Sequence, residues 1–351
     1  MSDVAIPGMA AILRLFSDGC SHSRKQIERA IRESPRTIHA LLNELLARGL
    51  LAQQGSASAP VYTLTLQGRV IVVFDLTAYL RRLPGTRATF VNIQPTFFDL
   101  FDGSIPKGAL SQFDMARSNY ALEQVHADLR VVRRELRQFM IDFIWMSSTL
   151  EGNTYTLNEV KHLLVKGVPS IERSPTETIM LINHKKAFDH IWRNHNDYRQ
   201  LTWGKLADLH QILATDLKIP IGLREKAVGI VDTVYTPPAT TAQLRHYLDI
   251  VLDRINRLKE PAEKALACLT LLPYLQPFVK GSEQTSRMMA NAILLAHGYP
   301  PISLLTAKVR EYNGGLRLFY EQGALGNLRQ LVLEQLAYSS THYFVRDKYA
   351  L

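Results

Sequence analysis

Hydrophobic positions in the first seventy residues recur at the three- and four-residue spacing of short amphipathic helices. Three helices are predicted, over residues 9–18, 23–34 and 34–49. Ser23 and Ser34 can cap the second and third helices, and Pro35 occupies the favoured first helical position. Residues 50–65 then predict two short strands around a small polar tip. This order of elements predicts a small domain over residues 1–70.

The hydrophobic pattern changes twice after this segment. Residues 71–119 are interrupted by proline and glycine, but they carry more aromatic side chains than a flexible linker would. We therefore expect a connector that packs against the domain following it. From residue 120 to 351 the pattern is mostly helical, so the chain as a whole is predicted to be mainly α.

Composition narrows the class of protein. A chain of 351 residues is long enough for about two domains. No stretch approaches the ~18 uninterrupted apolar residues of a membrane span, and the start lacks the pattern of a signal peptide. Cys20 and Cys268 lie far apart and predict neither a disulfide nor a metal site. We expect a cytoplasmic protein without membrane partners, whose net charge of +9 permits nucleic-acid binding.

The first domain resembles the winged helix-turn-helix domains of bacterial regulators over residues 7–68. That resemblance implies that the third helix enters the major groove of DNA. The candidate base-reading residues are Arg36, Thr37, His39, Ala40 and Asn43, and the candidate phosphate contacts are Arg24, Lys25 and the tip at residues 54–58. The alternative is a winged helix used for dimerisation or protein docking.

A second motif lies in the stretch "SSTLEGNTYTLNEV", which follows a long helical pattern. Gly152 and Asn153 tolerate a left-handed backbone and are predicted to end that helix. By itself Glu151 would be a solvated carboxylate at a helix end. The stretch nevertheless resembles the inhibitory helix of Fic-family proteins, placed here at residues 147–153 and matched by Ser147, Glu151 and Gly152.

The resemblance to the Fic family continues over residues 120–335. Residues 223–238 are similar to the family's flap, a strand and turn followed by Tyr235, Pro237 and Pro238. Residues 261–302 are similar to the family's two core helices and the loop between them. The resemblance implies a Fic-type helical domain with a β-hairpin flap, at which a protein partner could dock.

Active members of this family transfer AMP from ATP to a protein hydroxyl with a loop of the form His-Pro-Phe-x-Asp/Glu-Gly-Asn-Gly-Arg-x-x-Arg. The matching residues here are "QPFVKGSEQTSR". Pro277, Phe278, Gly281 and Arg287 are kept, whereas Gln276, Lys280, Ser282, Glu283 and Gln284 differ from the family.

The five differences remove the chemistry that the family loop would supply. Gln276 stands in place of the histidine base, and an amide cannot take a proton near neutral pH. Lys280 replaces the acid that binds magnesium, and a cation cannot ligate one. Ser282 is predicted to cap the following helix, which places the negative charge of Glu283 in its first turn. Gln284 removes a cationic contact to phosphate.

Several local contacts are expected around this loop. Glu151 and Arg287 are predicted to form an ion pair, and Lys280 a second one with Glu283. Pro273 is predicted to end or kink the first core helix before the loop. The three histidines between the motifs, His184, His190 and His195, are predicted to lie at the surface or at helix ends.

The sequence therefore predicts a DNA-binding regulatory protein with a degenerate, autoinhibited Fic domain. That domain would be a pseudoenzyme used for homodimerisation, ligand sensing or protein docking, with no catalytic residue, cofactor or metal. One alternative is an active AMP transferase that uses ATP and magnesium. Another is a protein-interaction scaffold without DNA binding.

Overall fold

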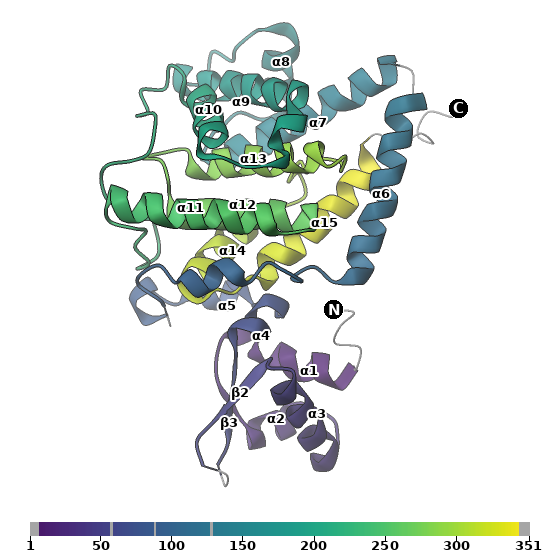
Figure 1. Ribbon diagram of the computed structural model, residues 1–351, viewed down its shortest axis with the longest axis vertical. Coiled ribbons are helices and arrows are strands. Elements are labelled where there is room, and N and C mark those ends of the chain that lie inside the picture. The colour runs from purple at the N-terminus through teal and green to yellow at the C-terminus, as the bar shows by residue number, and fades with distance from the viewer. Residues whose placement is uncertain (1–6, 57–58, 88, 127–128, 344–351) are drawn as a thin grey trace.

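The computed structural model describes residues 7–56, 59–87, 89–126 and 129–343. It is mainly helical, as predicted, and has a small unit at the N-terminus below a larger helical unit (Figure 1). The small unit contains α1 (Pro7–Leu15), β1 (His22–Ser23), α2 (Arg24–Ala30), α3 (Pro35–Ala47), β2 (Leu51–Gln54) and β3 (Val61–Leu64). The three strands form an antiparallel sheet in the order β1-β3-β2.

Local capping signals explain where the helices of the N-terminal unit begin. The Ser23 hydroxyl accepts a hydrogen bond from Gln26 N at the start of α2, and the Ser34 hydroxyl accepts one from Thr37 N at the start of α3. The second helix is shorter than predicted and ends at Ala30, because Ile31 is already extended (φ −104°, ψ 128°). The two-residue strand β1 was not predicted, since it is too short to give a pattern.

The segment after the sheet joins the two units. It contains α4 (Leu66–Ile71), α5 (Leu76–Arg81), 3-10 turns at Pro84–Thr86 and Pro95–Asp99, and the start of α6 (Lys107–His126). Phe97, Phe98 and Phe101 are buried in the core of the helical unit, so this segment is packed, as expected. The backbone of this segment passes close to Gly326 at Val72. A Cβ at position 326 would lie only 1.9 Å from the Val72 carbonyl oxygen, so a side chain does not fit there.

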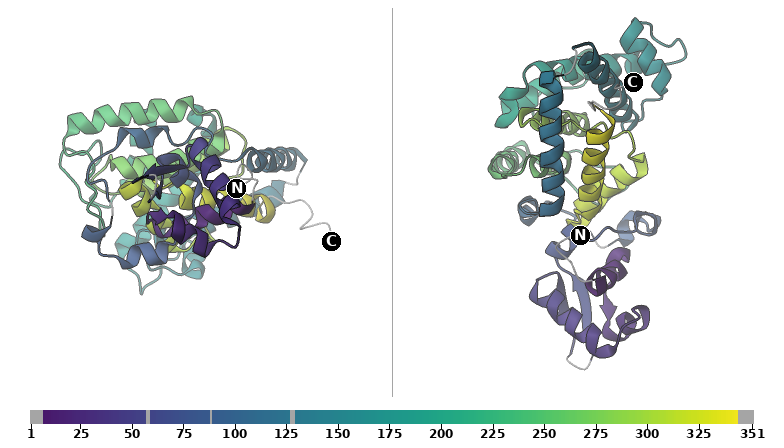
Figure 2. Two further views of the ribbon diagram at one scale, coloured as in Figure 1. Left: turned by 90° about the horizontal axis from the view of Figure 1, so that it is seen from below. Right: turned by 90° about the vertical axis from the view of Figure 1, so that its right-hand side faces the viewer.

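The helical unit is built around a central pair of buried helices. It consists of α7 (Leu129–Thr149), α8 (Leu157–Lys166), α9 (Pro175–Arg193), α10 (Trp203–Ala214), α11 (Thr241–Arg257), α12 (Pro261–Leu275), α13 (Ser282–Ala296), α14 (Val309–Gln322) and α15 (Gly326–His342), with a 3-10 turn at His195–Arg199. Every residue of α12 is buried, and α13 packs beside it. Figure 2 shows α6 and α15 side by side at one edge of the unit.

Two features of the helical unit differ from the sequence predictions. Pro273 was predicted to end or kink α12, and it does not end the helix, which continues to Leu275 because the N–H of Gln276 bonds to Leu272 O and closes the last turn. Residues 223–238 form no strand; Thr236 makes a single bridge with Asn92 instead of a hairpin. Side-chain anchors, described below, hold this segment in place of strand pairing. None of the described helices has both the length and the apolar character that crossing a membrane requires.

Candidate functional site

A cavity of about 620 Å³ opens where the loop after α12 meets the flap segment and α14. Its lining includes Leu150, Glu151, Ile230, Val231, Gln276, Lys280, Glu283, Gln284, Asn313, Leu316, Arg317 and Tyr320. The last four lie at helical spacing on one face of α14. This volume is within the range of about 300–1,000 Å³ typical of small-molecule sites.

The backbone of the loop is held by residues outside it. Phe278 is buried and stacks on the His210 ring, with centroids 3.7 Å apart and planes 4° from parallel. His210 Nε2 is 2.9 Å from Lys280 O, so this nitrogen donates to the carbonyl. Burial lowers the pKa of His210 and favours its neutral form. The loop shape therefore depends on α10.

Arg224 fixes the other end of the loop and ties it to the flap. Its side chain is buried and donates from Nε to Gln276 O (2.6 Å) and from Nη2 to Pro238 O (2.7 Å). These bonds satisfy a carbonyl at the C-terminal end of α12, where a cation is favoured. Sequence reasoning did not single out Arg224, because its partners are carbonyl groups far along the chain.

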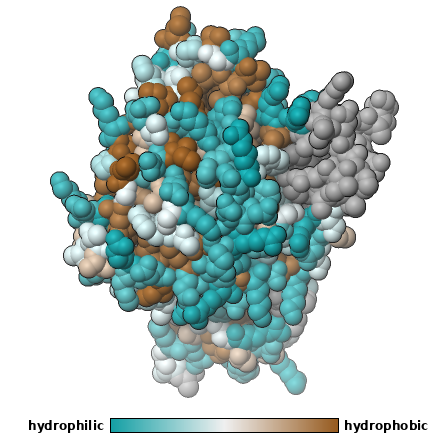
Figure 3. Space-filling view, turned by 45° about the horizontal axis from the view of Figure 1, so that its top comes forward, coloured by the Kyte–Doolittle hydropathy of each residue, from teal (hydrophilic) through white to brown (hydrophobic). Residues whose placement is uncertain are grey.

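Aromatic packing anchors the end of the flap. The Tyr235 ring is buried and stacks on the Tyr274 ring at 4.5 Å, while its hydroxyl donates to Tyr274 O (2.8 Å). Pro237 and Pro238 are also buried. Val231 and Val234 in the flap are exposed and present apolar surface, as does Ile221 just before it. Figure 3 shows brown apolar patches among polar side chains on the upper face of the helical unit.

The start of α13 differs from the prediction. Gly281 (φ 85°) is the N-cap, and Ser282 is the first helical residue, so Ser282 does not cap the helix. Its hydroxyl instead lies 3.2 Å from Phe278 N and accepts that hydrogen bond inside the loop. Lys280 is exposed, and no ion pair joins it to Glu283 within residues 276–287, all of which are described.

Glu283 occupies the first turn of α13 beside the cavity. Burial and the nearby Glu151 carboxylate raise the pKa of Glu283 to about 7, while the Arg287 and Arg317 charges oppose that shift. This carboxyl group therefore titrates near neutral pH. It also brings negative charge to a helix end that would otherwise favour an anion.

Glu151 and Arg287 meet, as predicted from residues 136 positions apart. Arg287 Nη2 lies 2.6 Å from Glu151 Oε1, with an Arg287 side chain that is fully buried and a Glu151 side chain that is 22% exposed. Arg287 also donates from Nε to Ser147 Oγ (2.9 Å) and from Nη2 to Ser147 O (3.0 Å). Helix α7 ends at Thr149, so Glu151 lies in the following turn, closed by Gly152 (φ 85°).

His184 extends this cluster into the core, contrary to its predicted surface position. Its Nδ1 lies 3.0 Å from Met180 O and must donate there, so Nε2 accepts from the Ser147 hydroxyl (3.2 Å). The protein surrounds His184 completely, and this burial, together with the Arg287 charge, lowers its pKa to about 4. A histidine at the surface and one in the core have the same local sequence signal.

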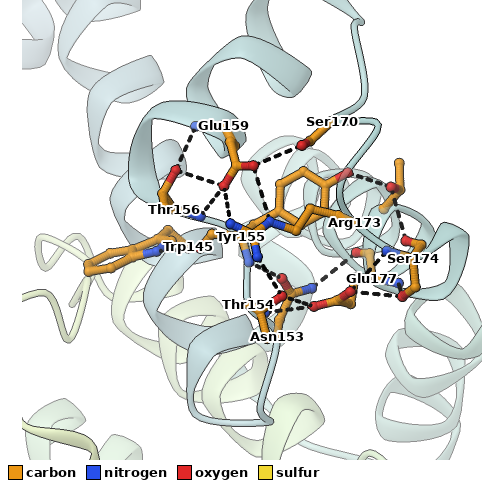
Figure 4. A network of polar contacts seen from close by, with 11 residues as sticks. Trp145, Asn153, Thr154, Tyr155, Thr156, Glu159, Ser170, Arg173, Ser174 and Glu177 are labelled. Carbon is orange, nitrogen blue, oxygen red and sulfur yellow. Dashed lines mark hydrogen bonds and ion pairs between the residues drawn. The ribbon is translucent and has the colours of Figure 1, made fainter.

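A network of charged side chains fastens the segment that follows Glu151 (Figure 4). Asn153 donates to Glu177 O (3.1 Å), and the Thr154 N–H donates to the Glu177 carboxylate (2.7 Å). Arg173 donates to both oxygens of Glu159, at 3.1 and 3.0 Å. The Thr154 bonds lower the pKa of Glu177 to about 2, and Arg173 lowers the pKa of Glu159. The turn that carries Glu151 is thus held from both sides.

The residues at the cavity do not fit a magnesium ion. Of the two carboxylates that line the cavity, Glu151 is bonded to Arg287, and the raised pKa of Glu283 opposes the deprotonated form that a metal ligand requires. Lys280 adds a cation to the same wall. Among the described residues, no three side chains of the types that ligate metals are grouped as a metal site would need.

Most of the candidate DNA-contacting residues are exposed on the N-terminal unit. Arg36, Thr37, His39 and Asn43 are all exposed on α3. Lys25 is exposed at the start of α2, whereas Arg24 is half-buried and bonded to Glu28 at 2.8 Å. Of the tip at residues 54–58, Ala57 and Ser58 lie outside the described residues.

Comparison with known proteins finds similarity to one family over part of the helical unit. Residues 200–294 match the Fic/DOC family, a range that contains α10 to α13 and the loop. The chain is 24% identical over 206 residues to the protein adenylyltransferase fic-1 of Caenorhabditis briggsae, covering 57% of this chain and 40% of that protein. It is 27% identical over 244 residues to the protein adenylyltransferase Fic of Drosophila mojavensis, covering 64% and 44%. The chain thus spans less than half the length of these curated relatives.

Solved structures agree on the fold. Fic-1 (residues 134–508) from Caenorhabditis elegans matches with a TM-score of 0.57 and 19% identity, covering 67% of this chain and 69% of that one. A Fic domain-containing signalling protein from Bacteroides thetaiotaomicron matches with a TM-score of 0.53 and 20% identity, covering 66% and 95%. The helical unit has the Fic fold. The match over residues 200–294 to the Fic/DOC family falls within this fold.

Proposed function

We propose that this protein is a DNA-linked regulator whose Fic domain no longer transfers nucleotide. The observation that carries the proposal is the loop at residues 276–287. Its backbone is anchored by Arg224 and His210, while Gln276 stands at the position of the family's base and the cavity carboxylates do not fit a magnesium ion. A site that keeps an anchored loop and a cavity but lacks the family's catalytic side chains suits ligand sensing or protein docking.

The enzymatic half of the proposal is tested with labelled ATP and magnesium or manganese. We expect no AMP transfer to the protein itself or to lysate proteins, because Gln276 cannot act as the base. The variant Glu151→Gly, which breaks the contact to Arg287, should remain equally inactive. Labelling by the wild type that disappears in Gln276→Ala would instead support adenylyl transfer, the activity named for the relatives.

The DNA half of the proposal rests on the exposed residues of α3. We propose that Arg36 and Asn43 read bases and that Arg24 and Lys25 contact phosphates, with a homodimer favouring an inverted repeat. Arg36→Ala should then relax sequence preference in a gel-shift assay. The double variant Arg24→Ala, Lys25→Ala should weaken all sequences alike and flatten the log–log salt slope by about 2.

A matched control lies on α11. Arg257→Ala removes the same charge from an exposed position of the helical unit and should leave DNA affinity and salt slope unchanged. If the wild type gives no salt-sensitive shift with its upstream region or with random duplex, the N-terminal unit is a protein-docking module instead.

A further inference from the structure

We infer that the cavity is coupled to the N-terminal unit through a buried polar chain, Asp232–Arg87–Glu321–Tyr79. This inference deepens the proposed function and rests on it, because it gives an occupant of the cavity a route to the proposed DNA-binding unit.

The polar chain begins at the wall of the cavity. Arg317, on the α14 face that lines the cavity, lies 3.2 Å through Nη2 from Asp232 Oδ2 in the flap. Asp232 directly follows Val231, another lining residue, and its carbonyl oxygen accepts a hydrogen bond from Arg87 Nη2. A molecule that moves the flap therefore moves the group that holds Arg87.

The middle of the chain is a buried ion pair that is incompletely bonded. Arg87 Nη1 lies 3.5 Å from Glu321 Oε1, and both side chains are almost fully buried. In this described region Arg87 Nε, Arg87 Nη1 and Glu321 Oε1 have no hydrogen-bond partner. Buried charges are stable only when well bonded, so small displacements of Arg87 change the energy of this pair strongly.

The polar chain ends at Tyr79, in the core of the N-terminal unit. The Tyr79 hydroxyl donates to Glu321 Oε2, and burial together with this bond raises the pKa of Tyr79, so the phenol remains a donor. Tyr79 is buried in the same hydrophobic cluster as Phe16 and Phe74. The neighbouring Gln322 receives a bond from Arg69 Nη1 at 2.9 Å. Helix α14 thus contacts the cavity along one face and the N-terminal unit at its end.

Main-chain bonds make the same junction continuous. The N–H of Thr236 in the flap bonds to Val91 O (2.7 Å), and the N–H of Phe90 bonds to Glu321 O (2.8 Å). Arg87 and Val91 therefore contact the flap, and Arg87 and Phe90 contact the end of α14. Coupling of this kind must act in both directions, since two linked sites perturb each other by the same free energy.

Hydrogen exchange followed by mass spectrometry on the full chain tests this reciprocity. Asp232→Asn breaks the pair with Arg317, and asparagine tolerates the left-handed backbone at this position (φ 61°). We expect severalfold faster exchange at the far end, including the N–H of Asp75, which bonds to Ser17 O. Tyr79→Phe should reciprocally speed exchange of the Thr236 N–H in the flap.

Two controls define what the chain contributes. Asp99→Asn breaks an exposed ion pair between the same connector and Arg254 on α11. It should change the exchange rate of neither the Asp75 N–H nor the Thr236 N–H. In an Arg87→Met background, Asp232→Asn should no longer affect Asp75. If each variant alters only its own end, or Arg87→Met leaves the long-range response intact, the coupling is refuted.

A duplex-binding measurement on the same variants separates this inference from the proposed function. If the wild type binds DNA, Asp232→Asn should shift the affinity and Asp99→Asn should not; an unchanged affinity in both would refute the link from cavity to DNA. If the wild type binds no DNA, the proposed function fails, and the exchange experiment alone decides whether the units are coupled.

Discussion

Replacing Glu283 by glutamine should stabilise the helical unit above neutral pH and leave it unchanged in acid. In the folded protein the pKa of this carboxyl is about 7, against 4.5 for an ordinary glutamate, because it is buried beside Glu151. Below pH 4.5 the group is protonated in both the folded and the unfolded state. As the pH rises through 7, the folded protein loses a proton that the unfolded chain released earlier, and the stabilisation from holding that proton is lost.

The size of this effect follows from the shift in pKa. At about 1.4 kcal/mol per pKa unit, the glutamine variant should gain on the order of 3 kcal/mol over the wild type at pH 8. Urea unfolding followed by tryptophan fluorescence reports on the helical unit alone, because Trp145, Trp192 and Trp203 all lie there. Glu225→Gln, at an exposed flap position, removes the same charge and serves as the control. A stability difference that does not vary with pH would refute the argument.

Two further expectations concern the cluster around Arg287. Loss of one partner of a buried ion pair costs about 3–5 kcal/mol, and Glu151→Gln should destabilise the protein by an amount near the lower end of that range. Asp99→Asn, at an exposed pair, should cost about 0–1 kcal/mol. Urea unfolding measures both. His184 has a lowered pKa of about 4, so its contribution to stability is present above pH 6.5 and is lost as the pH falls toward 4. His184→Gln should remove on the order of 3 kcal/mol of this acid sensitivity, and an unchanged pH profile would contradict it.

Local signals in the sequence predicted the parts of this structure that depend on neighbouring residues. Ser34 followed by Pro35 fixes the start of α3, because the cap and the first turn lie within four residues. The Glu151–Arg287 contact was also predictable, although only through the resemblance to a known family. In both examples the interacting residues could be named from the sequence, in the first from local spacing and in the second from the family motif.

The remaining parts depend on partners that a single sequence does not identify. Arg224 and His210 hold the loop through carbonyl groups 52 and 70 positions away, and any residue can supply a carbonyl. The surface prediction for His184 failed because packing against other elements decides which histidine of a helix is buried. The local sequence does not reveal that packing. The flap was predicted as a hairpin, but anchoring by Arg224 and Tyr235 replaces strand pairing there.

Because Arg224 and His210 bind the loop through its peptide carbonyls, a side chain such as that of exposed Lys280 can be exchanged without loosening the backbone, whereas the Ser282 hydroxyl belongs to the frame. Phe278 adds the stacking on His210 that keeps the loop in place. The stretch is therefore a preformed host for protein engineering. New acid–base pairs or metal ligands grafted onto it would inherit a rigid frame, which designed sites most often lack.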